Sequence, residues 1–309
     1  MKKKSLLIIG GTGFFGRSIL DYIDKSFSLK KKINDITVIS RGKKNFFIHK
    51  NLKKRIKITY IKKNIINLKK IPYADYVFYC AILKNHKDDH RAVKNYFKLA
   101  KKYHKRSKII YTSSGAVYGQ QPKYLKKFNE NYFLKNKRID FENKDRNMYS
   151  VYKLKNENIF KKLGELGLEV SIARCFAFVG KFLPRKSNYI VGNFIQSILD
   201  RQPIKIKADY GIVRSYMHTD DLVEWLLKIV SKANNTCPIY NVGSNYPVNM
   251  RTVGLYLAKR NKLSIKLNKI RTNFADVYLP SITKAKKELK LKLRYSSLKA
   301  INDTVNSLI

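Results

Sequence analysis

Short apolar segments alternate with segments of helical periodicity along the first half of this 309-residue chain. Runs rich in β-branched and aromatic residues predict strands at residues 5–10, 35–40, 56–61, 75–81, 108–114 and 169–176. Helical patterns lie between several of them, at residues 18–23, 91–103 and 149–163. Nearly continuous apolar strands separated by helices are typical of a parallel sheet that is covered on both faces. The predicted fold class is therefore α/β, with a doubly wound parallel sheet.

Glycines follow the first expected strand at a spacing that suits nucleotide binding. Gly10, Gly13 and Gly16 form a GxxGxxG pattern at the start of a helical segment. The first glycine allows a tight turn, the second lets the backbone approach a pyrophosphate, and the third allows close helix packing. The amides at the helix N-terminus then face the phosphate charge. A purely structural turn is the alternative, but the position after the first strand favours a dinucleotide-binding Rossmann sheet.

The end of the second expected strand bears on the choice between NAD and NADP. An NAD-binding protein usually places an acid there to hold the ribose 2′-hydroxyl. Ser40 and Arg41 stand at that position in this chain. A hydroxyl and a guanidinium suit a 2′-phosphate, so the sequence favours NADP(H), with NAD(H) still possible. The alternative is that Arg41 is only an exposed residue of a lysine-rich loop.

A strand end and a later helix carry residues suited to proton transfer. Tyr149 and Lys153 are four apart in "MYSVYKLKNE", so on a helix they share one face. A tyrosine hydroxyl has a pKa of about 10, and work near neutrality requires lowering it by about three units, or roughly 4 kcal/mol. A neighbouring ammonium and the positive charge of a nicotinamide can supply that stabilisation. Ser114 would hydrogen-bond the same substrate oxygen. Because the chain has 21 tyrosines, the alternative is an ordinary amphipathic helix face.

Taken in order, these motifs resemble the extended short-chain dehydrogenase/reductases, grouped broadly as the NAD-dependent epimerase/dehydratase family, which act on nucleotide-activated sugars. The resemblance covers nearly the whole chain and is carried by "GGTGFFG", "TSSGAVYG", the YxxxK helix, "IARCFAFVGKFLP", "GNFIQSIL", "RSYMHTDDL" and "YNVGS". It implies that Ser114, Tyr149 and Lys153 are the catalytic triad. It also implies that Ser114, Asn193 and Arg214 contact the substrate, the last two at its diphosphate. A helix cap is the alternative for Asn193.

The same resemblance implies a set of cofactor contacts from the glycine turn, the strand ends and the YxxxK helix. Asn64 and Ile65 stand where relatives commonly have an aspartate against the adenine. The implied contacts are Gly10, Thr12, Gly13, Phe14, Phe15, Gly16, Ser40, Arg41, Asn64, Ile65, Ala81, Tyr149 and Lys153.

The reaction is narrowed by two residues after the catalytic serine. The 4,6-dehydratases that this chain resembles have an Asp-Glu pair there, and this chain has Gly115 and Ala116. Without an acid to protonate the leaving hydroxyl, dehydration is disfavoured. We expect an NADPH-dependent reductase of a nucleotide 4-keto-6-deoxy sugar in surface polysaccharide biosynthesis. The alternatives are an epimerase without net cofactor turnover and a non-catalytic nucleotide-binding scaffold.

The periodicity loosens after residue 176, which suggests two domains. We expect residues 1–176 to form the NAD(P)-binding Rossmann domain and residues 177–309 mainly a smaller substrate-binding lobe. A late strand at residues 239–243 is expected to return to the main sheet. Relatives pair two helices per subunit into a dimer interface, so the resemblance implies a homodimer through the segments around 91–103 and 149–163.

The net charge of +45 raises the question of nucleic acid binding. Lysine outnumbers arginine by 51 to 15, and the lysines are spread along the chain without the arginine clusters of specific readers. We expect no specific nucleic acid partner. Cys80, Cys175 and Cys237 lie far apart beside apolar runs, and the histidines lack ligand spacing. These features indicate reduced thiols, a cytoplasmic location and no metal. No segment is apolar and long enough to suggest a membrane partner.

Overall fold

The computed structural model describes residues 3–42, 52, 54–132, 144–185 and 189–309. The chain forms two compact units, which are described separately. The first unit comprises Met1–Gly119, Arg138–Cys175 and Val223–Tyr240. The second unit comprises Gln120–Lys137, Phe176–Leu222 and Asn241–Ile309. The assignment of cofactor binding to residues 1–176 and of substrate binding mainly to residues 177–309 stays a prediction.

A seven-stranded sheet is the centre of the fold, in the order β11-β6-β5-β4-β1-β2-β3. The neighbours from β6 to β3 pair in parallel. The predicted α/β class with a doubly wound parallel sheet is confirmed. The late strand β11 lies at one edge of the sheet, beside β6. The strands are β1 (Lys4–Ile9), β2 (Ile33–Ser40), β3 (Lys57–Lys62), β4 (Tyr76–Tyr79), β5 (Lys108–Ser114), β6 (Glu169–Cys175) and β11 (Ile239–Val242).

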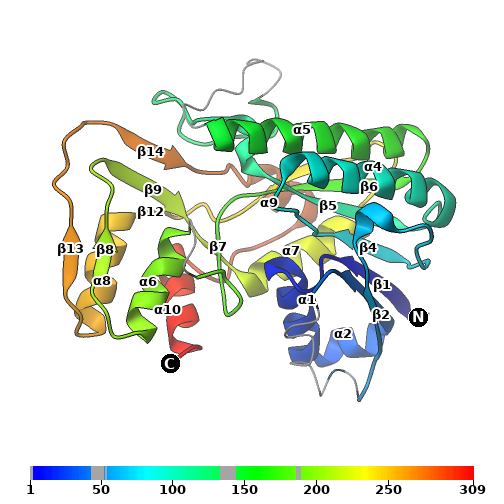
Figure 1. Cartoon of the computed structure of the whole chain (residues 1–309), viewed down its shortest axis with the longest axis horizontal. Coiled ribbons are helices and arrows are strands. Elements are labelled where there is room, and N and C mark those ends of the chain that lie inside the picture. The colour runs from blue at the N-terminus through cyan, green and yellow to red at the C-terminus, as the bar shows by residue number, and fades with distance from the viewer. Residues whose placement is uncertain (1–2, 43–51, 53, 133–143, 186–188) are drawn as a thin grey trace. The chain divides into compact units, whose positions relative to one another are not determined.

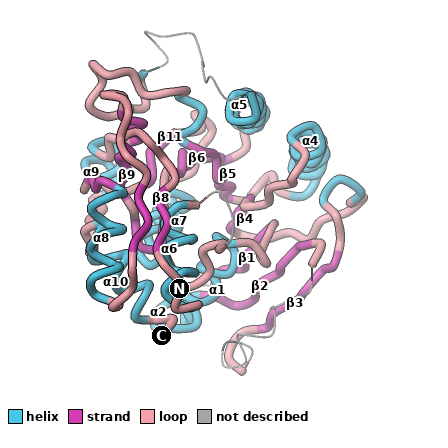
Figure 2. Tube along the Cα trace, turned by 60° about the vertical axis from the view of Figure 1, so that its left-hand side comes forward, coloured by secondary structure: helices cyan, strands magenta, loops and turns pink. Residues whose placement is uncertain are grey.

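Helices cover both faces of this sheet, whose central strands β1, β4, β5 and β6 are buried along most of their length. Figure 1 shows α4 and α5 along one face and α1 along the other, and Figure 2 shows the same order of layers from the side. The helices of this unit include α1 (Phe14–Lys25), α2 (Phe27–Lys32), α4 (His86–Tyr103) and α5 (Lys144–Glu165), and most of α7 (Thr219–Ser231) belongs to it as well. The 3₁₀ turns η2 (Ile65–Asn67) and η3 (Gly115–Tyr118) follow β3 and β5.

An aromatic cluster fixes α4 and α5 on the sheet. Tyr79 of β4 and Tyr111 of β5 are fully buried, as are Tyr96 of α4 and Phe160 of α5. The rings of Tyr111 and Phe160 stack with centroids 4.3 Å apart. Tyr79 packs against Tyr96 at 5.0 Å and against Phe160 at 5.4 Å. Large aromatic side chains have few rotatable bonds, so this packing sets the position of α5 relative to β5.

The second unit is built from short strands and helices. It contains a three-stranded sheet, β12-β9-β14, and two strand pairs, β13-β8 and β10-β7. The strands are β7 (Phe178–Val179), β8 (Ile204–Ile206), β9 (Gly211–Ser215), β10 (Met217–His218), β12 (Pro247–Asn249), β13 (Ile265–Leu267) and β14 (Ala275–Tyr278). The helices are α6 (Ile190–Leu199), α8 (Met250–Arg260), α9 (Thr283–Leu289) and α10 (Ser297–Asn306), and α7 (Thr219–Ser231) begins here.

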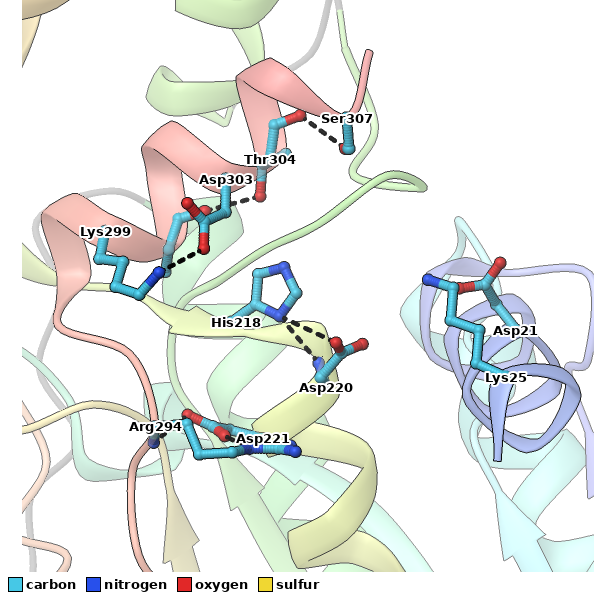
Figure 3. A network of polar contacts seen from close by, with 11 residues as sticks. Asp21, Lys25, His218, Asp220, Asp221, Arg294, Lys299, Asp303, Thr304 and Ser307 are labelled. Carbon is cyan, nitrogen blue, oxygen red and sulfur yellow. Dashed lines mark hydrogen bonds and ion pairs between the residues drawn. The ribbon is translucent and has the colours of Figure 1, made fainter. Parts of the chain in front are cut away.

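A buried carboxylate ties the start of α7 to the loop before α10. Asp221 is 1% exposed and accepts hydrogen bonds from the Arg294 backbone amide at 3.0 Å and from its Nε at 2.7 Å. Figure 3 shows this pair beside His218, whose Nδ1 lies 3.7 Å from the Asp220 carboxylate. Asp220 and Asp221 thus stand in the first turn of α7, where negative charge stabilises a helix.

Candidate functional site

The glycine turn after β1 has a geometry that only glycine adopts without strain. Gly10 has φ +89°, and a Cβ placed on it would lie 2.6 Å from the Ala81 backbone nitrogen and Cα. A Cβ on Gly16 would overlap the backbone of Gly11. Helix α1 begins directly after Gly13, and no side chain caps it there. The strand, the turn and the helix N-terminus therefore have the arrangement that the sequence predicts for a phosphate-binding turn.

A pocket opens at the carboxyl ends of β1, β2, β3 and β4 in the first unit. Eight of the thirteen predicted cofactor contacts line it: Gly10, Thr12, Gly13, Ser40, Arg41, Asn64, Ile65 and Ala81. The other five, Phe14, Phe15, Gly16, Tyr149 and Lys153, are not among its lining residues. Sequence reasoning missed six that are: Ile9, Ile39, Lys63, Cys80, Ile82 and Leu83. Their common signal is that they adjoin the ends of predicted strands.

The charge in this pocket is positive. Arg41 and Lys63 line it, and no Asp or Glu does so among the residues that the structure describes. The two segments are held together because the Lys63 amide donates to the Ser40 carbonyl at 3.2 Å. The Ser40 and Thr12 hydroxyls are also hydrogen-bonded to each other. This rim can hold an anionic group beside two hydroxyls.

Helix α5 brings Tyr149 and Lys153 together, as their spacing predicts. The Lys153 Nζ lies 5.9 Å from the centroid of the Tyr149 ring. It also donates a hydrogen bond to the Tyr111 hydroxyl of β5 at 3.3 Å. Lys153 is buried and Tyr149 is half-buried. A buried ammonium beside a more accessible phenol is the arrangement that favours proton transfer by the phenol.

Two adjacent serines at the end of β5 have different surroundings. Ser113 is buried and donates to Glu157 Oε1 of α5 at 2.6 Å. Ser114 is half-buried, and its Oγ accepts from the Ala116 amide at 3.1 Å, which caps η3. Of the two hydroxyls, only that of Ser114 belongs to a side chain with access to solvent. This difference supports the choice of Ser114 as the substrate-contacting residue.

Glu157 is the centre of a buried polar network that the sequence reasoning missed. Arg174 of β6 donates to its carboxylate from Nη2 at 2.8 Å and from Nε at 3.0 Å. The Arg174 Nη1 also donates to the Tyr118 hydroxyl of η3 at 2.9 Å. Glu157 stands one turn after Lys153 on α5. The network therefore joins the helix that bears Tyr149 and Lys153 to the strand that ends in Ser114.

The two predicted diphosphate contacts lie in the second unit. Asn193 is exposed within the first turns of α6, and the helix cap is Tyr189, so Asn193 is not the N-cap residue. Arg214 of β9 pairs with the Asp276 carboxylate of β14 at 2.6 Å and donates to the Asp276 carbonyl. A bound diphosphate would compete with Asp276 for this guanidinium. Both substrate contacts stay predictions.

Three thiols lie in the first unit, and none is paired. Burial raises the pKa of Cys80, which lines the pocket, to about 12. It raises the pKa of Cys237 to about 12 and that of Cys175 still further. Across the described residues, no three His, Cys, Asp or Glu side chains group as metal ligands. The described helices include none with the length and apolar character needed to cross a membrane.

Comparisons with known proteins agree with this fold. The model of the NAD dependent epimerase/dehydratase family matches residues 6–243. A search of curated proteins found no match. Among solved structures, the chain is similar to a UDP-N-acetylglucosamine 4-epimerase from Methanobrevibacter ruminantium in complex with UDP-N-acetylmuramic acid, at 20% identity and a TM-score of 0.77, covering 100% of this chain and 99% of that one.

Two further solved structures have the same fold. One is a dTDP-glucose 4,6-dehydratase from Bacillus anthracis in complex with NAD, at 16% identity and a TM-score of 0.77, covering 98% of this chain and 95% of that one. The other is a UDP-glucuronic acid 4-epimerase mutant from Bacillus cereus with a fluorinated UDP-sugar and NAD, at 16% identity and a TM-score of 0.77, covering 99% of this chain and 100% of that one.

Proposed function

Because the chain belongs to the NAD-dependent epimerase/dehydratase family, we propose that it transfers hydride between a nicotinamide dinucleotide and a nucleotide-activated sugar. The observation that supports this most directly is the pairing of Tyr149 with Lys153 on α5. The same unit contains the glycine turn, whose close approach to Ala81 leaves no room for a side chain at Gly10. These residues fit a dinucleotide, since backbone amides and an uncapped helix N-terminus suit its pyrophosphate.

Each residue of the proposed triad has a role that follows from its surroundings. Tyr149 gives a proton to, or takes one from, the sugar oxygen at the reacting carbon. Lys153 stabilises the phenolate through its charge, and its burial keeps that charge poorly screened. Ser114 donates to the same sugar oxygen and fixes its position. A bound nicotinamide supplies or accepts the hydride.

NADP(H) is the cofactor that the pocket rim favours. Arg41 and Lys63 both line the pocket just after β2 and β3, and the described lining offers no carboxylate to a ribose 2′-hydroxyl. Two cations and two hydroxyls suit a 2′-phosphate. NADP(H) thus remains our proposal over NAD(H), which is the cofactor named in two of the solved relatives.

The reaction we propose is reduction of a nucleotide 4-keto-6-deoxy sugar, as in surface polysaccharide biosynthesis. Gly115 and Ala116 carry no acid, which disfavours dehydration. The cationic rim favours a reductase because NADPH is the usual exchangeable reductant. Epimerisation without net cofactor turnover is the second candidate, supported by the epimerases among the solved relatives.

The test measures the change in absorbance at 340 nm when the protein is mixed with NADPH or NADH and with each of a panel of nucleotide 4-keto-6-deoxy sugars. We expect a stoichiometric loss of NADPH signal, and Tyr149→Phe should lower the rate by about 10²- to 10⁴-fold. Tyr152→Phe is the matched control, because Tyr152 is on the same helix but packs on His86 and His90. A changed sugar without loss of signal would indicate the epimerase. Bound cofactor without any turnover would contradict an enzymatic function.

A further inference from the structure

A buried acid lies beside the lysine of the proposed triad. Asp89 of α4 is 5% exposed, and its Oδ2 lies 4.0 Å from the Lys153 Nζ of α5. The chain has 21 acidic residues and 66 Lys and Arg residues, so a carboxylate at the surface would have many cationic side chains to pair with. Burying a carboxylate is costly unless it is hydrogen-bonded and paired with a charge. The placement of Asp89 therefore points to a role for its charge next to Lys153.

Contacts other than Lys153 already fix the orientation of Asp89. Its Oδ1 accepts from the Leu83 backbone amide at 2.9 Å, and its Oδ2 accepts from the Asn156 side-chain amide at 3.2 Å. The Asn156 Oδ1 in turn is hydrogen-bonded to His90 Nδ1 at 2.7 Å. The carboxylate is thus held in place from α4, α5 and the loop before α4. Lys153 meets a negative charge whose position does not depend on Lys153.

Oxygen groups around Lys153 favour its charged form. Burial lowers the pKa of Lys153, but nearby oxygen groups outweigh this effect and raise the pKa above its ordinary value. These groups are Tyr111, Tyr149 and Asp89, in that order of effect. Lys153 therefore stays protonated across the neutral range. The ammonium thus faces three oxygen groups that compete for its charge: the Tyr111 hydroxyl, the Tyr149 phenol and the Asp89 carboxylate.

We propose that Asp89 is a positioning residue for Lys153. The Asp89 carboxylate holds the Lys153 ammonium in place and offsets part of the positive field of that ammonium at Tyr149. This inference rests on the proposed function, because it assigns a purpose to the field at Tyr149. A like charge disfavours a phenolate and an opposite charge favours it. The reactivity of Tyr149 is accordingly set by the Lys153–Asp89 pair and not by Lys153 alone.

Other titratable groups also lie around this pair. Burial raises the pKa of Tyr79, Tyr111, Cys80 and Cys175 above the ordinary values of these groups. The ring of His86 lies 5.7 Å from that of Tyr149, and His90 reaches Asp89 only through Asn156. Among the described residues of α4, α5, β4, β5 and β6, Asp89 is the acid that forms an ion pair with Lys153.

The test measures the ionisation of Tyr149 directly by NMR, in protein labelled with ¹³C at the Cζ of tyrosine. The Tyr149 resonance is assigned by its absence in Tyr149→Phe. In Asp89→Asn the side-chain oxygen can still accept from Leu83, while the charge is removed. We expect the titration midpoint of Tyr149 in this variant to fall by about 0.5–1 pH unit relative to the unsubstituted protein. An unchanged or raised midpoint in folded Asp89→Asn would overturn the proposal.

Asp88→Asn is the matched control. It removes the same formal charge one residue away, but Asp88 is 45% exposed and pairs with Arg91 on the surface. The midpoint should not move in this variant, because solvent screens an exposed charge. A fall in Asp89→Asn but not in Asp88→Asn therefore separates the buried charge from a charge at the surface.

Two features keep the outcome informative. If Asp89→Asn does not fold, Asp89→Ser is the second neutral variant, with the same expected fall and the same overturning result. The NMR midpoint does not depend on turnover. If no sugar nucleotide is converted in the 340 nm assay, the proposed function fails, while the midpoint still decides whether Asp89 offsets the charge of Lys153.

Discussion

Loss of the Glu157 charge should destabilise the first unit by far more than the loss of a surface acid. Glu157→Gln keeps the size of the side chain but removes the negative charge that faces the buried Arg174 guanidinium. The two side chains are 0% and 3% exposed and lie 2.8 Å apart. Breaking a buried pair of this kind costs about 3–5 kcal/mol of unfolding free energy. A change of 3 kcal/mol corresponds to a more than 100-fold shift in the unfolding equilibrium, at about 1.4 kcal/mol per tenfold.

The assay is guanidinium unfolding followed by tryptophan fluorescence. The single tryptophan, Trp225, is fully buried in the first unit, so its signal reports on the unit that contains the pair. Glu169→Gln is the control, because the Lys108–Glu169 pair at 3.0 Å is 30% and 42% exposed. An exposed pair contributes about 0–1 kcal/mol. The reasoning is refuted if Glu157→Gln costs no more than Glu169→Gln.

Two further outcomes are expected. Gly10→Ala should lower the free energy of unfolding by about 1–3 kcal/mol, because φ is +89° there, and it should also weaken NADPH binding. The control is Gly42→Ala, which has open space around it and should lower the free energy of unfolding by less than about 0.5 kcal/mol. An equal cost at both positions in unfolding and NADPH titrations would contradict this. Burial lowers the pKa of His104, whose ring nitrogens bond to Tyr96 and Pro72. The unfolded chain therefore takes up the proton first, and stability falls below about pH 6.5. Unfolding at pH 7.5 and 5.5 should show less pH dependence in His104→Gln than in the unsubstituted protein; equal dependence would oppose the assignment.

The features predicted from sequence are those with a local pattern. Short runs rich in β-branched and aromatic residues identified the seven strands of the main sheet, and the central strands β1, β4, β5 and β6 are buried along most of their length. The spacing of Gly10, Gly13 and Gly16 identified the turn, and the spacing of Tyr149 and Lys153 identified a shared helix face. In each case the residues that act together lie within one or two helical turns in the sequence.

The features that were missed depend on contacts between distant segments. Asp89 and Lys153 are 64 positions apart, and no periodicity in the sequence connects them. In the sequence Glu157 is not distinguished from other polar helix residues, because its partner Arg174 lies on β6. Lys63 was missed because the chain has 51 lysines, so the presence of a lysine at one position does not indicate a binding site. The strands of the second unit have two to five residues, too few for an alternating pattern to be recognised.

The raised pKa values of the three cysteines have a practical consequence for studying this protein in solution. A thiol reacts with disulfide reagents as the thiolate, so the buried Cys175 and Cys237 should be labelled only when the surrounding structure opens, whereas Cys80 is partly exposed and lines the pocket. The labelling rate of Cys175 and Cys237 then measures the frequency of opening in the first unit, which also contains Trp225. The second unit contains no cysteine or tryptophan, so its motions are invisible to both probes unless one is introduced there.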